Sequence, residues 1–425
     1  MDKDNGQRSN RTHAHACICP KHMQAEIPVQ GIKVNDFPDD ALSVYGIFKH
    51  NNNWDVLSFV EGENIRPVVK EEVRKLFGCK DGSSGFIEYY CPECKEFRTV
   101  HFGCNSRLCT SCGKGHTDRW AAQLPKAMYD VPQRHVVLSL PDKLWPVFLD
   151  RWDRLKVLMD AAIHVLEDVF SHRARRHIMP GAVVVLHPFG RDLGFKPHVH
   201  IIVTEGGFDR KGNFVHMSYI PYEAMRKSWQ YHVLTGLKAV LPKTREWSEF
   251  IDWLFTIYPK GFYAYLPEES RIRSLKDMGK YLARYVRHPA IANFRLHGYD
   301  GARVTFWYLD NEGRRHYRTM AVFEFMRAIV RHIPDRQFKV IRHYGAYWRR
   351  IKSRFRSFLR QLSLRQTRLD EFETIGRNIC SECGSKMYFV MYRKKGPPER
   401  GWWEGRKLRF GERLRDWAII LDKLT

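Results

Sequence analysis

The chain has 425 residues, 44% of them hydrophobic, and 71 lysines and arginines against 47 aspartates and glutamates, for a formal net charge of +24. This length allows two or three domains, and the charge indicates a polyanionic partner, with nucleic acid ahead of an anionic membrane surface. The opening MDKDNGQRSN lacks the apolar core of a secretory signal, and no run approaches the roughly 18 apolar residues of a membrane span, so we expect a cytoplasmic, nucleoid-associated protein with no membrane partner.

A cysteine-rich segment, residues 79–125, follows an N-terminal region, residues 1–78, for which the sequence indicates no role. In a reducing compartment, the ten cysteines of the chain are better explained as metal ligands or buried thiols than as disulfides. Two Cys-x-x-Cys pairs predict a zinc-binding module in which one structural Zn²⁺ is held by Cys91, Cys94, Cys109 and Cys112.

Three further cysteines are less clearly placed by their spacing. Cys104 is interpreted as a buried thiol, with replacement of one of the four zinc ligands as the alternative. Cys380 and Cys383 form another Cys-x-x-Cys pair, but no cysteine or histidine follows closely behind them. Either distant residues complete a site with this pair, or the pair binds no metal.

Residues 126–335 alternate between short apolar runs and segments with helical spacing. RHVVLSLP (134–141), GAVVVLH (181–187) and HVHIIVT (198–204) predict strands, and the apolar positions of 143–177 predict a long helix. A helical insertion is expected around 216–275, followed by a helix at 274–288 and a hairpin around the turn DNEG. Strands grouped in this way with long helices between them predict an α+β domain with a mostly antiparallel sheet.

Two histidines stand one residue apart in the stretch KPHVHIIVTEGG. Side chains alternate between the two faces of a strand, so His198 and His200 share one face, where both imidazoles can reach one divalent ion. The alternative is a strand end with two exposed histidines. The neighbouring predicted strands and the tyrosine-bearing helix downstream favour the ligand pair.

The stretch KYLARYVRHPAI places Tyr281 and Tyr285 four residues apart, and therefore on one helix face, with Lys280, Arg284 and Arg287 around them. A pair of packed core aromatics is the alternative. A tyrosine hydroxyl attacks a phosphodiester only when the developing charge is stabilised, and a metal ion does this. The two-histidine strand and the two-tyrosine helix together therefore predict one nuclease site.

Residues 336–425 are predicted to form a basic, mostly helical DNA-binding region. From 336 to 369 there is no acidic residue, and aromatic side chains alternate with arginines. This mixture favours single-stranded DNA through phosphate attraction and base stacking. An amphipathic helix with a buried apolar face is the alternative. The candidate DNA-binding residues of the chain are Lys280, Arg284, Arg287, Arg342, Tyr344, Trp348, Arg349, Arg350 and Arg354.

The order of these motifs, with VIRHYGAYWRR after the tyrosine helix, resembles the HUH transposases of the insertion-sequence-91 type, relatives of rolling-circle replication proteins. The resemblance covers residues 88 to 350 and leaves 1–75 outside. It implies an RRM-like antiparallel HUH endonuclease domain with a small N-terminal zinc-ribbon module and a helical basic C-terminal region. It further implies that His198 and His200 hold Mg²⁺ or Mn²⁺ and that Tyr281 and Tyr285 are nucleophiles.

The reaction implied by this resemblance cuts and rejoins single-stranded DNA at element ends and target through a 5′-phosphotyrosine, without ATP. His288 is a candidate for a third metal ligand that the sequence does not otherwise place. A replication initiator or relaxase with the same chemistry is one alternative, disfavoured by the zinc cluster and by RHYG. A non-enzymatic zinc-ribbon protein that binds DNA, with packed histidines and tyrosines, is the other.

Overall fold

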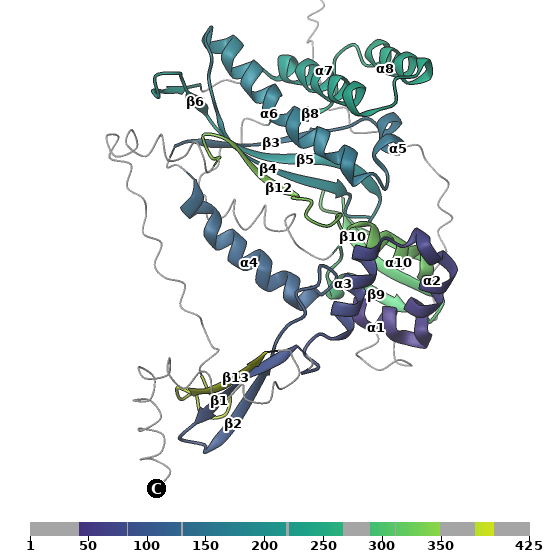
Figure 1. The fold of residues 1–425 in the computed structure, drawn as a ribbon, viewed down its shortest axis with the longest axis vertical. Helices are drawn as coiled ribbons and strands as arrows, with labels where there is room; N and C mark the ends of the chain where they lie inside the picture. The colour runs from purple at the N-terminus through teal and green to yellow at the C-terminus, as the bar shows by residue number, and fades with distance from the viewer. Residues whose placement is uncertain are drawn as a thin grey trace, which may run out of the picture. The chain divides into compact units, whose positions relative to one another are not determined.

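The computed structural model describes residues 42–82, 84–128, 131–217, 221–266, 290–310, 312–348 and 379–394 (Figure 1). These residues form helices and antiparallel sheets, which confirms the predicted α+β class. Among them, no helix is both long and apolar enough to cross a membrane.

The largest sheet has five strands in the order β12-β4-β5-β3-β8, and each neighbouring pair is antiparallel. Its strands are β3 (Gln133–Ser139), β4 (Gly181–Phe189), β5 (Phe195–Thr204), β8 (Ala264–Tyr265) and β12 (Ile341–Gly345). The three inner strands coincide with the apolar runs that predicted strands, because valine and isoleucine pack well on a pleated surface.

Two long helices cover one face of this sheet, α6 (Trp152–Ala174) and α7 (Tyr222–Val240) (Figure 1). Val199, Ile201 and Val203 of β5 point into the core beneath them and are fully buried. Burial of each such side chain contributes about 1.5–3 kcal/mol, so this face fixes the position of β5. Helix α8 (Arg245–Ile257) joins the same core, and η5 (Asp142–Leu144) and α5 (Trp145–Phe148) lead into α6.

The opposite face of the sheet carries the alternate residues of β5, His198, His200 and Ile202, as strand alternation predicts. Helix α4 (Thr110–Ala127) contributes Leu124 to a smaller core there with Ile202 and Val185. A hairpin of β6 (Gly206–Phe208) and β7 (Phe214–His216) follows β5 and packs into this core.

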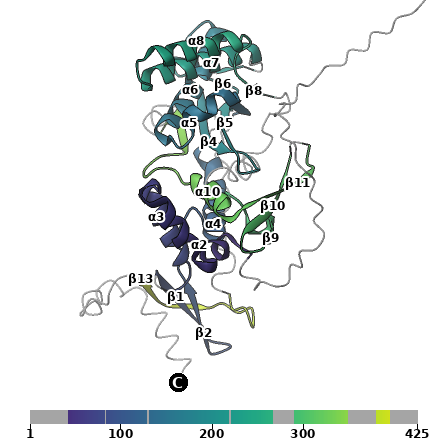
Figure 2. The same cartoon turned by 90° about the vertical axis from the view of Figure 1, so that its right-hand side faces the viewer.

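A second core joins the N-terminal helices to residues 290–333. The helices are α1 (Val44–Lys49), η3 (His50–Asn52), α2 (Asn53–Glu61), η4 (Gly62–Asn64) and α3 (Pro67–Phe77). Their partners are η7 (Asn293–Arg295), the sheet of β9 (Leu296–Tyr299), β10 (Arg303–Leu309) and β11 (Arg315–Ala321), and α10 (Val322–Arg331), seen in Figure 2. The predicted hairpin around DNEG is β10–β11. Residues predicted as the single span 126–335 thus contribute to two cores.

A third, small sheet combines the hairpin of β1 (Gly85–Cys91) and β2 (Glu96–His101) with β13 (Tyr388–Lys394), in the order β13-β1-β2. The mostly helical structure predicted for 336–425 is wrong at β12 and β13, which are strands. Because β12 pairs with β4, the large sheet includes residues beyond the domain boundary expected at 335. Both segments, IRHYG and YFVMYRK, contain β-branched and aromatic residues that favour strands over helices.

Candidate functional site

Three histidines on adjacent strands form a cluster on the face of the large sheet opposite α6. His198 and His200 come from β5, and His187 of β4 lies directly opposite His198 in the register. One ring nitrogen from each of the three lies within 4.8 Å of the other two. His187 is thus a candidate for the third metal ligand, whereas His288, the candidate from the sequence, lies outside the described residues.

The distance between His187 and His198 suits two ligands of a single cation. His187 Nδ1 and His198 Nε2 are 3.1 Å apart, and two nitrogens that bind one ion at about 2.1 Å and at right angles would be about 3.0 Å apart. His198 Nδ1 donates a hydrogen bond to the carbonyl oxygen of Lys196 at 2.6 Å. Metal-binding histidines commonly donate their second ring N–H in this way, and the bond leaves His198 Nε2 as the ring nitrogen able to bind a cation.

A fourth histidine supports the cluster from the neighbouring strand. His135 of β3 places its Nε2 3.1 Å from His200 Nδ1. The two rings are nearly parallel, at an interplanar angle of 5° with centroids 5.3 Å apart. His135 therefore holds the ring orientation of His200, a role that no motif in the sequence indicated.

Burial keeps these imidazoles neutral at physiological pH. It lowers the pKa of His135 to about 4 and holds the pKa values of His187 and His200 well below the usual range, with the neighbouring histidines adding to the effect at the latter two. The pKa of His198 is also lowered, chiefly by burial. A neutral imidazole has a nitrogen lone pair for a cation, so the electrostatics suit metal binding without a prior loss of protons.

A cavity of about 440 Å³ adjoins the cluster, with His187 in its lining. Its lining also includes three arginines, Arg107, Arg191 and Arg295, and several aromatic residues, among them Phe294 and Trp307. The Phe294 side chain is exposed, and its ring centroid lies 5.8 Å from that of Trp307. Guanidinium groups attract phosphates and aromatic rings stack on bases, so this lining suits a nucleic-acid strand with unpaired bases.

The described cysteines form two four-thiol clusters instead of the one site that the sequence predicted. The first contains Cys79, Cys104, Cys109 and Cys112, and the second contains Cys91, Cys94, Cys380 and Cys383. The predicted grouping of Cys91 and Cys94 with Cys109 and Cys112 around one ion is therefore wrong. The chain between Cys79 and Cys104 leaves the first cluster as the β1–β2 hairpin and carries its own Cys-x-x-Cys pair to the second.

Sulfur–sulfur distances in the first cluster fit a tetrahedral zinc site. Cys79 lies 3.5 Å from Cys109 and 3.9 Å from Cys112, and Cys104 lies 3.9 Å from Cys112. Four thiolates around one zinc at about 2.3 Å would be about 3.8 Å apart. The backbone N–H of Ser106 donates to Cys104 Sγ at 3.4 Å, a contact that stabilises a thiolate. Cys104, interpreted above as a buried thiol, thus belongs to this cluster, together with Cys79, which the sequence analysis missed.

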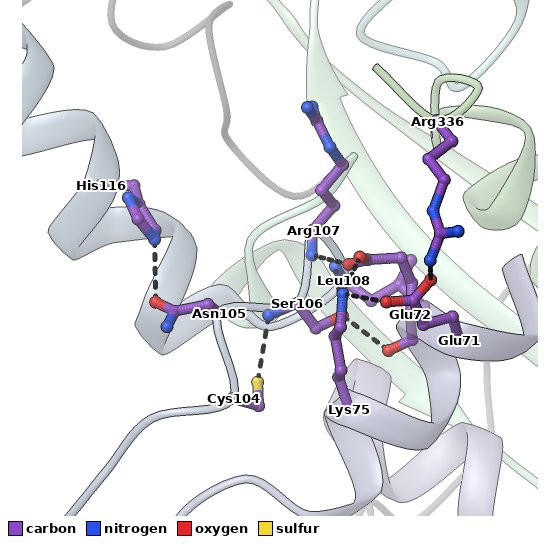
Figure 3. A network of polar contacts seen from close by, with 10 residues as sticks. All are labelled: Glu71, Glu72, Lys75, Cys104, Asn105, Ser106, Arg107, Leu108, His116 and Arg336. Carbon is purple, nitrogen blue, oxygen red and sulfur yellow. Dashed lines mark hydrogen bonds and ion pairs between the residues drawn. The ribbon is translucent and has the colours of Figure 1, made fainter. Parts of the chain in front are cut away.

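Helix α3, within the region for which the sequence indicated no role, fixes the loop that carries this cluster (Figure 3). The buried Ser106 hydroxyl donates to the backbone carbonyl of Glu72 at 2.8 Å, and the Arg107 N–H donates to the Glu72 carboxylate at 2.6 Å. Lys75 pairs with the same carboxylate at 2.9 Å. The zinc module therefore extends back into α3.

The described DNA-binding candidates differ from one another in setting. Arg342 and Tyr344 lie on β12, and both bind the carboxylate of Asp160 on α6, at 3.3 Å and 2.9 Å. Burial raises the pKa of the half-buried Tyr344. These two side chains anchor β12 to α6, on the face opposite the histidines. Trp348, by contrast, is 46% exposed.

The remaining predicted site residues lie outside the described residues. From the predicted tyrosine helix they are the candidate nucleophiles Tyr281 and Tyr285 and the candidate DNA-binding residues Lys280, Arg284 and Arg287. From the basic segment they are the candidate DNA-binding residues Arg349, Arg350 and Arg354.

Comparisons with known proteins identify two transposase domains in the chain. A "Transposase zinc-binding domain" model matches residues 50–140, and a "Putative transposase" model matches 181–354. The first range contains all four thiols of the first cluster and begins well before residue 88, so part of the region expected to fall outside the resemblance lies inside it. The second range contains all three clustered histidines.

Two transposases are similar to much of the chain. One is the transposase for insertion sequence element IS801 from Pseudomonas savastanoi pv. phaseolicola, 31% identical over 320 residues that make up 72% of this chain and 76% of that protein. The other is "Putative transposase y4qJ" from Sinorhizobium fredii, 22% identical over 63% of this chain and 71% of that protein. No solved structure matches. The extent of the first similarity and the two matched domains show that the chain belongs to the transposases of the insertion-sequence-91 type.

Proposed function

We propose that this transposase cuts and rejoins single-stranded DNA through a covalent 5′-phosphotyrosine, at a site where His187, His198 and His200 hold a divalent ion. The observation that carries the proposal is the three-histidine cluster, with neutral rings and nitrogen spacing that suit one cation. The antiparallel sheet, with histidines on one face and α6 and α7 on the other, supports an RRM-like HUH arrangement.

The chemistry follows from the donor set and from the tyrosines of the resembling motif. An ion such as Mg²⁺ or Mn²⁺ supplies Lewis-acid stabilisation of the negative charge that develops on the scissile phosphate. The hydroxyl oxygen of Tyr281 or Tyr285 attacks the phosphorus, and the bond from phosphorus to the 3′ oxygen breaks. The tyrosine loses its proton, and the released 3′ oxygen gains one to become a free hydroxyl.

Rejoining is the reverse reaction with a different 3′-hydroxyl. The hydroxyl attacks the phosphotyrosine, the tyrosine leaves, and a phosphodiester is restored without ATP because no bond energy has been lost to hydrolysis. Two tyrosines would hold two strand ends at the same time, as strand exchange requires.

The arginine- and aromatic-lined cavity beside His187 supports single-stranded DNA as the substrate, because unpaired bases can stack there while the strand lies close to the histidines. Such a substrate places the protein at the nucleoid. The first cysteine cluster, inside the matched zinc-binding range, is proposed to hold one structural Zn²⁺ that fixes the loop Cys104–Leu108 against α3.

The ion is tested with labelled single-stranded DNA from the flanks of the gene. Wild-type protein should form a covalent adduct, stable to denaturant, with Mg²⁺ or Mn²⁺ and none in excess chelator. His187→Ala and His198→Ala should lose the adduct but keep most DNA affinity, because the basic surface supplies the affinity. His164→Ala is the matched control, since His164 is exposed on α6. Undiminished cleavage in chelator would refute the role of the ion.

The tyrosines are tested by phenylalanine, which keeps the ring and removes the attacking oxygen. Tyr281→Phe and Tyr285→Phe should each form some adduct but fail to complete strand transfer, and the double variant should form none. A denaturant-stable adduct from the double variant would refute the tyrosine chemistry. If wild-type protein binds the strand but cleaves under no ion condition, the non-enzymatic alternative is favoured.

A further inference from the structure

The second cysteine cluster joins two parts of the chain that are far apart in sequence. Cys91 and Cys383 are separated by 292 residues, and Cys94 and Cys380 by 286. We propose that these four thiols bind a second structural zinc, which fastens the C-terminal strand β13 to the N-terminal β1–β2 hairpin. Cys91 and Cys94 lie inside the matched zinc-binding range, whereas Cys380 and Cys383 lie beyond both matched ranges, so the proposed site links that domain to a part of the chain outside it.

The geometry of the cluster is that of a metal site and differs from that of disulfides. Cys91 Sγ lies 3.6 Å from Cys383 Sγ, and Cys94 Sγ lies 3.8 Å from Cys380 Sγ. These separations are close to the roughly 3.8 Å between thiolates around one tetrahedral zinc. They are almost twice the S–S bond length of about 2.05 Å. All four sulfurs lie within 4.8 Å of one another, so one ion can contact them all.

Each Cys-x-x-Cys pair stands at a tight turn that directs both sulfurs to the same side. Cys91 ends β1, and Cys94 follows in the turn that leads into β2. In the second turn, the Cys380 N–H donates to the Ser385 carbonyl at 2.8 Å, and the Gly384 N–H donates back to the Cys380 carbonyl at 3.0 Å. Gly384 has φ of +72°, a left-handed conformation that favours glycine. The second pair therefore stands in a turn already shaped for a metal.

The strands of this sheet have little apolar surface with which to hold one another. Its buried core consists of Tyr89, Met387 and two of the cysteines themselves, Cys91 and Cys380. Strand β13 is an edge strand whose ladder partner is β1. Three short strands around so small a core fall below the size at which burial alone stabilises a fold, and structural metals commonly supply the missing cross-link. The zinc is therefore inferred to hold β13 in register with β1.

The first test counts the zinc that a thiol-specific mercurial releases from full-length protein. Because the reagent reacts with thiols, an ion bound at the histidines is not counted. Wild type should release two zinc ions per chain. The double variant Cys380→Ser/Cys383→Ser should release one, and so should Cys109→Ser/Cys112→Ser from the first cluster. Ser381→Ala, an exposed change within the same turn, should still release two. One ion from wild type, or two from Cys380→Ser/Cys383→Ser, would overturn the proposal.

Two measurements remain decisive if a cysteine variant fails to fold. Wild-type protein loaded with ¹¹³Cd should show two resonances in the tetrathiolate range, and a single one would contradict a second site. Alkylation of denatured, metal-free, unreduced wild type should modify all four thiols of the second cluster, whereas protection of these four would show disulfides in place of a metal. In soluble Cys380→Ser/Cys383→Ser protein, amide exchange in β1 should accelerate while exchange in β4 and β5 stays unchanged, and unchanged exchange in β1 would refute the fastening role.

Discussion

Replacement of His135 by phenylalanine tests a residue that supports the proposed metal site without being one of its three proposed ligands. The change keeps an aromatic ring stacked on His200 and removes the nitrogen that lies 3.1 Å from His200 Nδ1. If His200 binds the ion through Nε2, its Nδ1 carries a proton and donates to His135. The variant then leaves this donor buried without its acceptor, and the ring of His200 loses the contact that orients it.

The expected loss of metal affinity follows from the contact between His135 and His200. A buried donor left without its partner costs about 1–3 kcal/mol. Loss of a group that orients a metal-binding histidine typically lowers metal affinity 10- to 100-fold, which corresponds to about 1.4–2.7 kcal/mol. The two figures agree, so the ion concentration that half-saturates cleavage should rise by about one to two orders of magnitude, with the maximal rate largely restored at saturating ion.

The assay is a titration of adduct formation with Mn²⁺, for wild type, His135→Phe and the control His164→Phe, which changes an exposed ring on α6. The control should follow wild type. An unchanged half-saturating concentration in His135→Phe would refute the claim that His135 positions His200. A maximal rate that stays low at saturating ion would show instead that His135 acts on the DNA or on the reaction.

Three further outcomes follow from buried contacts. Arg134→Leu removes the partner at 2.7 Å from the Glu205 carboxylate, which is only 1% exposed and keeps His216 at 3.2 Å; the free energy of unfolding should fall by about 1.5–3 kcal/mol in urea titrations, and a fall below about 0.5 kcal/mol would contradict this. Gly103→Ala would place a methyl carbon 2.5 Å from Cys112 Sγ, so one mercurial-releasable zinc should be lost, whereas Gly298→Ala, with open space around it, should retain all zinc. Tyr344→Phe removes the bond to Asp160 and should cost about 0.5–1.5 kcal/mol of stability with DNA affinity unchanged; weaker binding at unchanged stability would restore Tyr344 as a DNA contact.

The sheet and the face of its histidines could be predicted because strand periodicity is a local property. Side chains of a strand such as HVHIIVT alternate between its two faces. Because Val199 and Ile201 face the core, His198 and His200 must lie together on the opposite face. Stretches with mixed composition are less determined locally. Whether IRHYG continues a basic helix or joins a sheet depends on a free edge of β4, which no property of those five residues shows.

His187 and His135 were missed because their role arises from pairing between strands. Antiparallel register places residue pairs of constant index sum opposite one another, and the β4–β5 hairpin sets His187 against His198. Given two strands joined by the short loop around Gly190–Gly194, this register could have been tested from the sequence by asking which residue lies opposite each histidine. Prediction of the contact between His135 and His200 also needs the tertiary fold, since the long helix α6 separates β3 from β5 in the sequence.

The cysteines show why a spacing rule can identify the kind of site and still misassign its ligands. Each Cys-x-x-Cys pair fixes two sulfurs through one turn, but a tetrahedral site also needs a second pair, and sequence proximity does not decide which pair arrives. Between Cys79 and Cys104 the chain makes a complete β1–β2 hairpin, so the pair at its far end cannot reach back to the first cluster. That hairpin offers β1 as a free edge for a further strand and carries two thiols at its tip. Strand β13 pairs with β1, and the cysteine pair that ends five residues before β13 lies beside those two thiols. Edge pairing and metal ligation thus specify the same partner, so the third Cys-x-x-Cys pair belongs at that hairpin.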